Sequence, residues 1–282
     1  MVHSAIFSWV TFIYFGSFVF YLIRAIRGNE VWGKLASLTA FVGFAMHSVA
    51  FALRWQASYG LGIGRIPLTN LYESLIFFAW AIVLLHLVIE WRIKNKSHGA
   101  FVLPFAFLCM AFASLSPTVD TRILPLLPAL QSNWLASHVI TCFMGYASFA
   151  IACGFGIMCL VRGKDFKAAD RSGSFRRILL PEGVVDDLIY QIAAMGFIFL
   201  TLGIITGSVW AHYAWGSYWS WDPKETWSLI TWIVYAIMLH ARFVAGWRGT
   251  RIAIMSIVGF AVVLCTYLGV NYLPGLHSYL KS

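Results

Sequence analysis

The chain has 282 residues, of which 60% are hydrophobic and only 11% are charged, and its mean hydropathy is +0.78. This composition excludes an ordinary soluble domain and is typical of a membrane protein. The formal net charge of +9 raises the possibility of nucleic-acid binding, but the placement of the charges, described below, argues against that class.

Apolar segments long enough to cross a membrane recur along the whole chain. A helix needs about 20 apolar residues to span about 30 Å of hydrocarbon. Because continuous apolar runs exclude a membrane β-barrel, we predict an all-α integral membrane protein with one polytopic domain over residues 1–282. The first span lacks a cleavage signal and is expected to be retained. We count eight spans, the fourth short and interrupted by Pro104, at about 5–23, 35–53, 70–90, 100–116, 134–161, 186–210, 225–245 and 252–273.

The basic residues are distributed unequally between the two sides of these spans. Fifteen of the twenty Lys and Arg residues fall at alternate connections, including the long connection 162–181. Positively charged connections remain in the cytoplasm, so this pattern places 162–181 there and both termini outside. The stretches 54–69, 117–133 and 210–225 are then also outside. That side carries only five basic residues, Arg54, Arg65, Arg122, Lys224 and Lys281.

The stretch 210–225, WAHYAWGSYWSWDPKE, combines many aromatic residues with a helix start. We expect a loop here between two spans. Asp222 suits the N-cap, Pro223 the first helical position, and Glu225 completes a capping box. The aromatic residues indicate either an interfacial belt or a flat apolar platform for a large planar ligand. They are Trp210, Tyr213, Trp215, Tyr218, Trp219 and Trp221.

A second stretch, GRIPLTNLYES at 64–74, precedes the third predicted span. Thr69 or Asn70 can cap that helix, and Pro67 stiffens its approach. Arg65 and Glu73 are interpreted as charges at the outer boundary with snorkelling side chains. The five cysteines all lie in predicted spans as packing residues, and the chain has neither a CxxC nor a CxxCH motif.

Three of the eight histidines, His47, His86 and His240, lie within predicted spans. Taken singly, each is more often a helix–helix hydrogen-bonding residue than a metal ligand. His3 and His98, in a terminus and a basic connection, are expected to be solvated.

Two other histidines, His138 and His277, lie near the outer ends of the fifth and eighth spans. The predicted topology places both on the side of the aromatic stretch. Histidine is a favoured axial ligand of haem iron, so the two form a candidate bis-imidazole haem site.

The sequence WGSYWSWDPKETW resembles the tryptophan-rich WWD motif of haem-handling proteins of cytochrome c biogenesis. The matching residues are Trp215, Gly216, Trp219, Trp221, Asp222 and Glu225. The stretch at 64–74 resembles the GxxPLSNLYESL segment of the CcsA (ResC) proteins. Over most of its length the chain resembles this subunit of the system II cytochrome c synthase.

The resemblance implies a haem-binding role for particular residues. It implies that haem b is bound as substrate, with His138 and His277 as outer axial ligands beside Trp215, Gly216, Trp219, Trp221 and Asp222. His240 matches a family histidine that holds haem within the membrane, where a CcsB (ResB) partner supplies a fourth histidine. His47 is either a further intramembrane ligand or a packing residue. The family pattern gives no ligand role to His86 or His212.

The implied function is relay of haem to the outer face and its positioning for thioether attachment to the CxxCH motif of apocytochrome c. The chain would then be a subunit of a holocytochrome c synthase of the haem lyase type, without an identifiable catalytic acid. Its location would be the bacterial cytoplasmic membrane, or the thylakoid membrane in a plastid. The expected partners are the CcsB-type protein, apocytochrome c and membrane lipid, and not nucleic acid.

Three other interpretations remain open. A CcmC-type protein also carries WWD and presents haem to a chaperone without forming a bond, but it has about six spans. A di-haem electron-transfer protein of the cytochrome b type would need paired histidines on facing helices. A channel or solute carrier would not bind haem at all.

Overall fold

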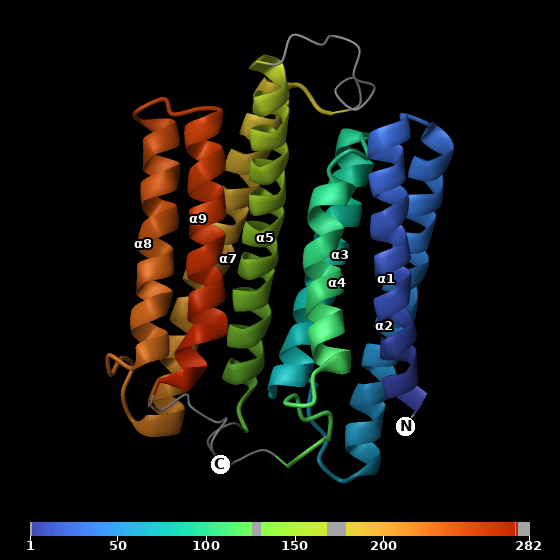
Figure 1. Ribbon diagram of the computed structural model, residues 1–282. Helices are drawn as coiled ribbons and strands as arrows, with labels where there is room; N and C mark the ends of the chain where they lie inside the picture. Colours follow the sequence, from blue (N-terminus) through green and yellow to red (C-terminus); the bar gives the residue numbers. More distant parts are fainter. Residues whose placement is uncertain (1, 126–130, 168–178, 274, 276–282) are drawn as a thin grey trace. The chain divides into compact units, whose positions relative to one another are not determined.

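The computed structural model describes residues 2–125, 131–167, 179–273 and 275. In these residues it contains eight α-helices, one short 3-10 helix and no strand (Figure 1). The all-α fold is therefore confirmed. The helices are α1 (Val2–Arg27), α2 (Glu30–Gly60), α3 (Leu71–Ile93), α4 (Gly99–Leu115), α5 (Asn133–Lys167), α7 (Glu182–Trp215), α8 (Pro223–Phe243) and α9 (Thr250–Tyr267), followed by η2 (Gly269–Tyr272).

Six of these helices, α1, α2, α3, α5, α7 and α9, are long and apolar enough to cross a membrane. The remaining two differ from them. Helix α4 has only 17 residues and contains Pro104, as its sequence suggested. Helix α8 has 21 residues but is not among the six apolar helices. The fold is that of a multi-pass membrane protein, and the count of eight spans remains a prediction for α4 and α8.

The chain forms two compact units. Unit 1 comprises residues 1–126 and 161–181 and contains helices α1 to α4. Successive helices are antiparallel, so α1 and α3 begin at the end of the unit where α2 and α4 finish (Figure 1). Two glycines let tyrosine rings of α1 pack directly against the backbone of neighbouring helices. A Cβ on Gly99 would lie 2.5 Å from the Tyr21 ring, and one on Gly43 would lie 2.8 Å from the Tyr14 ring.

Unit 2 comprises residues 127–160 and 182–282, with most of α5 and all of α7, α8 and α9. The rings of Phe149 and Tyr235 stack at 3.5 Å between α5 and α8. Helices α5 and α7 approach closely, since a Cβ on Gly145 would lie 3.0 Å from the Gly196 carbonyl oxygen. The end of α7 and the start of α8 lie at the same end of the unit as the start of α5 (Figure 1).

The predicted loop at 210–225 is shorter than expected, because α7 continues through Trp215. Three of the six aromatic residues of this stretch, Trp210, Tyr213 and Trp215, therefore stand on the last turns of a helix. The helix ends at Gly216, which has a φ of +77° and donates its N–H to the His212 carbonyl at 2.9 Å. Glycine suits this left-handed position because it has no Cβ.

Candidate functional site

The connection from α7 to α8 runs from Gly216 to Asp222 and folds back on α7. The Ser208 hydroxyl, on α7, donates to the Tyr218 carbonyl at 2.8 Å. The Tyr218 ring stacks on His212 with a centroid distance of 4.2 Å and an angle of 5°. The loop is thus fixed to the helix by one hydrogen bond and one ring stack.

The indole rings of this region meet edge to face. The rings of Trp210 and Trp215 are 4.8 Å apart at 66°, and those of Trp219 and Trp221 are 5.7 Å apart at 90°. These four indoles therefore do not lie in one plane, as a flat platform, one of the two interpretations of the sequence, would require. Two steeply angled pairs instead present both faces and edges, and Trp221 leaves 69% of its surface exposed at a backbone φ of +59°.

The start of α8 has the predicted capping box. Asp222 accepts the Lys224 N–H at 2.9 Å, and Glu225 accepts the Asp222 N–H at 3.2 Å. Glu225 also accepts the Ser220 N–H at 2.7 Å, which anchors the end of the aromatic loop to the helix. Both carboxylates are buried, so they act as structural acceptors for backbone groups at the helix start.

His138, in the second turn of α5, lies against the last third of α7. Its Nδ1 is 2.7 Å from the Gly203 carbonyl oxygen, and its ring is nearly parallel to Trp210, at 14° and 6.1 Å. A carbonyl oxygen only accepts, so Nδ1 carries the proton and the lone pair is on Nε2. Metal-binding histidines are commonly held in this way, with the non-ligating nitrogen donating to a carbonyl. The His138 side chain therefore fits the role of an iron ligand.

His277, the second predicted outer ligand, lies outside the described residues. Gly275, the last residue that the structure describes, lies against Asp222 and Pro223 at the end of the aromatic loop. A Cβ on Gly275 would overlap the Asp222 carboxylate and lie 3.0 Å from Pro223. The pairing of His277 with His138 remains a prediction.

His240 lies near the end of α8 and is exposed, on the same outward face as Ile233 and Ile237. Its predicted role in binding haem remains a prediction.

The histidines of unit 1 are core residues. His47 is fully buried, with its Nδ1 3.1 Å from the Tyr14 hydroxyl and its ring 5.5 Å from Phe7. This environment favours the packing interpretation of His47 that the sequence left open. His86 lies 3.1 Å from the Tyr21 hydroxyl through its Nε2.

His3 and His98 are also buried, so the expectation that both are solvated was wrong. His98 lies immediately before α4, and its ring is 4.8 Å from that of His86. The basic residues between α3 and α4 predict a solvated connection. Its last residue, His98, is nevertheless buried in the core at the start of α4.

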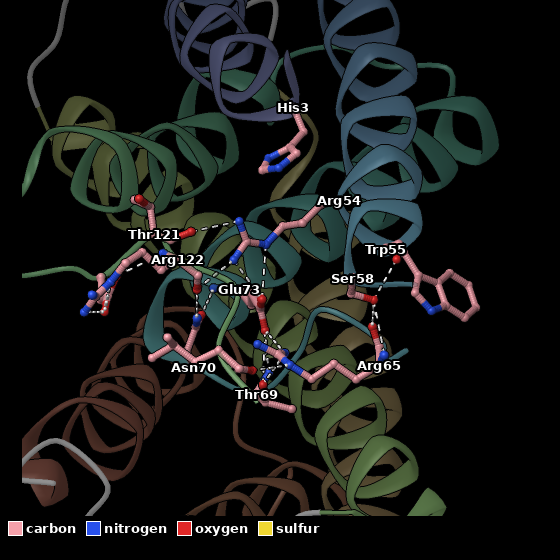
Figure 2. Close-up of polar contacts among 12 residues, drawn as sticks. His3, Arg54, Trp55, Ser58, Arg65, Thr69, Asn70, Glu73, Thr121 and Arg122 are labelled. Carbon is pink, nitrogen blue, oxygen red and sulfur yellow. Dashed lines mark hydrogen bonds and ion pairs between the residues drawn. The ribbon is translucent and has the colours of Figure 1, made fainter. Parts of the chain in front are cut away.

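A buried ion network links the segments at one end of unit 1 (Figure 2). Glu73 accepts from Arg54 at 2.9 Å through one oxygen and from Arg65 at 2.5 Å through the other. The predicted snorkelling of Arg65 and Glu73 is therefore wrong, because both side chains are buried and paired inside the fold. Asn70 caps α3 as predicted, accepting the Glu73 N–H at 2.8 Å.

The same network holds the segment that follows α4. Arg54 donates to the Thr121 carbonyl at 3.0 Å, and Arg65 donates to the Leu124 carbonyl at 3.1 Å. On its exposed side, hydrogen bonds from Arg122 lower the pKa of Asp120 to about 2. The network thus joins the last turns of α2, the first turn of α3 and the segment after α4. The sequence does not indicate the role of Arg54, because its partner Glu73 is 19 residues away.

Metal-binding clusters of three or more His, Cys, Asp or Glu side chains are absent from the part of the chain that the structure describes. A haem held by one or two imidazoles needs no such cluster, because the porphyrin supplies the other four ligands.

The fold and this loop define a class: multi-pass helical membrane proteins with a tryptophan-rich connection beside a histidine at one end of a helix bundle. The family model for the cytochrome C assembly protein matches residues 68–277, and the chain belongs to this family. Within it the chain is of the CcsA type. The cytochrome c biogenesis protein CcsA of Porphyra purpurea is 41% identical over 284 residues, with 87% of each chain covered. That of Marchantia polymorpha is 37% identical, with 99% of this chain and 96% of the relative covered.

A solved structure shares the fold. The cytochrome c haem lyase CcmF aligns with 99% of this chain at a TM-score of 0.70 and 15% identity. This chain spans about half the length of that protein, 49%. The family assignment gives the chain a role in cytochrome c maturation.

Proposed function

We propose that the chain binds haem beside the α7–α8 loop and holds it for thioether attachment to the CxxCH motif of apocytochrome c. The observation that carries this proposal is the His138 tautomer set by the Gly203 carbonyl, next to the paired indoles. A neutral imidazole with a free Nε2 is the form that binds haem iron. The indoles add apolar area for the porphyrin face.

The chemistry that this site would serve is the addition of a thiol to a vinyl group. The sulfur bonds to one vinyl carbon, the thiol hydrogen goes to the other, and no net oxidation occurs. Such a reaction depends on placing the two groups together, which can lower a barrier by about 7–11 kcal/mol. Asp222 and Glu225 are occupied by backbone N–H groups, so they serve the loop and not proton transfer.

The remaining elements of the proposal concern supply of the haem. His277 would provide the second axial ligand, and His240, on the outward face of α8, would bind haem within the membrane with a histidine from a CcsB-type partner. Haem b would be the form carried. The aromatic loop and both termini would face the extracytoplasmic side of a bacterial or thylakoid membrane.

The test is the visible spectrum of the protein purified with its partner, compared between the wild type and His138→Gly. The wild type should show a six-coordinate bis-histidine spectrum. The variant should lose that spectrum and cytochrome maturation, and imidazole in the medium should restore part of both by entering the space left by the side chain. The matched control is His212→Phe, which removes the imidazole nitrogens from the same region, keeps an aromatic ring for the stack on Tyr218, and should leave the spectrum unchanged.

Two results would contradict the proposal. An unchanged spectrum and normal maturation in His138→Gly would show that His138 is not the ligand. Haem bound by the wild type without thioether formation, when purified apocytochrome and reductant are supplied, would favour the CcmC-type interpretation of a haem presenter.

A further inference from the structure

Three glycines on α7, Gly196, Gly203 and Gly207, face α5. A Cβ on Gly196 would meet Phe149, and one on Gly203 would lie 2.5 Å from the Cys142 thiol and 3.2 Å from the Cys142 backbone nitrogen. These two positions are explained by close helix packing, in which small residues let backbones approach.

Gly207 differs from the other two. The three atoms nearest to a Cβ at this position all belong to the His138 ring: Nδ1 at 2.5 Å, Cε1 at 2.7 Å and Cγ at 3.2 Å. The absence of a side chain at Gly207 therefore makes room for an imidazole and not for a backbone. Alanine would be the better helix former here by about 1 kcal/mol, so local helix propensity does not explain the glycine.

The ring that occupies this space is held on two further sides by α7. Gly203, one turn before Gly207, accepts the Nδ1 proton at 2.7 Å, and Trp210, one turn after, lies nearly parallel to the ring. Residues 203, 207 and 210 share one helix face because their spacing is four and then three. Trp210 is only 2% exposed, so its indole is a fixed wall.

We propose that Gly207 and Trp210 are positioning residues that, with the Gly203 carbonyl, form a seat for the His138 imidazole. The seat fixes the ring plane and the Nδ1–H tautomer, and so fixes the direction of the Nε2 lone pair. The inference rests on the proposed function of His138 as an iron ligand, but the seat itself does not require haem to be tested. Loss of such a supporting contact typically lowers metal affinity or activity by about 10–100-fold.

The first experiment is Gly207→Ala, with Gly183→Ala as its matched control on the same helix. A Cβ on Gly183 meets open space, whereas one on Gly207 displaces the His138 ring. Gly207→Ala should lose the bis-histidine spectrum and lower haem retention by about 10–100-fold, while Gly183→Ala keeps both. Trp210→Phe should retain more haem than Trp210→Ala, because Phe preserves a flat wall. Equal spectra for Gly207→Ala and Gly183→Ala in haem-loaded protein would overturn the seat.

The second experiment tests the seat without haem, by the thermal stability of a double-mutant set. Gly207→Ala should lower the melting temperature when His138 is present. In the His138→Gly background the same change should be neutral or raise it, because the ring is no longer there to be displaced. An equal shift in both backgrounds would overturn the proposal. The melting temperatures test the seat even if the wild-type protein binds no haem. Absence of haem would contradict the proposed function but not the seat.

A third comparison uses imidazole rescue. Imidazole should rescue His138→Gly but not the double variant His138→Gly, Gly207→Ala, because the added methyl group occupies the place of the exogenous ring. Rescue of both variants to the same extent would contradict a role for Gly207 in seating the imidazole.

Discussion

Arg54 and Glu73 form an ion pair at 2.9 Å in which neither side chain has any exposed surface. Because Arg65 occupies the other oxygen of the same carboxylate, one negative charge is shared by two buried guanidinium groups. Other donors of the two arginines go to the Thr69 hydroxyl and to backbone carbonyls of the segment after α4. Removal of this single carboxylate should therefore affect the end of α2, the start of α3 and the segment after α4 together.

We expect Glu73→Gln to be strongly destabilising, because it leaves two buried cations without a counter-charge. Breaking a buried ion pair by removing one partner typically costs about 3–5 kcal/mol. The melting temperature of the detergent-purified protein measures this effect. Asp120→Asn is the control, since Asp120 pairs with Arg122 and the two side chains are 44% and 76% exposed, and exposed pairs contribute little to stability. Similar melting temperatures for the two variants would show that the Glu73 network is not a structural clamp.

The indoles of the loop give a second prediction. If Trp215, Trp219 and Trp221 bind porphyrin through aromatic surface, replacing any one with Phe should be tolerated better than replacing it with Ala. Haem content per protein and the yield of mature cytochrome c measure the difference. Normal values in the triple Ala variant would identify the loop as an interfacial belt only.

Asp222 allows its role as a helix cap to be separated from a role in catalysis. Asn caps helices about as well as Asp, whereas Ala costs about 0.5–2 kcal/mol. Asp222→Asn should therefore keep haem binding and maturation near the wild-type level, and Asp222→Ala should reduce both by loosening the loop. A catalytic carboxylate would give the opposite pattern, with Asn as damaging as Ala in the maturation assay.

The predicted topology can be tested with fused reporters. Because basic residues collect at alternate connections, a reporter after Lys281 should be active only outside the cytoplasm. A reporter inserted in the connection between α5 and α7 should give the opposite result. Cytoplasmic activity of the reporter after Lys281 would reject the eight-span topology.

Local signals in the sequence predicted local structure correctly. Asp222, Pro223 and Glu225 form the expected capping box because all the atoms involved lie within a few residues, and Asn70 caps α3 for the same reason. The apolar segments likewise identified the all-α membrane fold. The end of α7 was placed too early because the aromatic residues were read as a loop, although Gly216 carried the stop signal.

Long-range relationships were not available from one sequence. Arg65 and Glu73 were read as boundary charges because nothing local indicates that Arg54 comes to meet them. His138 was identified as a candidate ligand, but its seat on α7 depends on how two helices cross. Gly203, Gly207 and Trp210 share one face of α7, but only the packing of α5 on α7 shows that this face holds the His138 ring.

Trp221 illustrates a conflict between stability and use. A left-handed backbone conformation costs a bulky residue roughly 1–2 kcal/mol, and Gly or Asn would adopt it more easily. Its indole is also largely exposed, so packing within the protein does not offset the strain. The strained backbone at Trp221 makes the loop less stable. In return it directs a large aromatic ring away from the protein core and toward the surroundings of the loop.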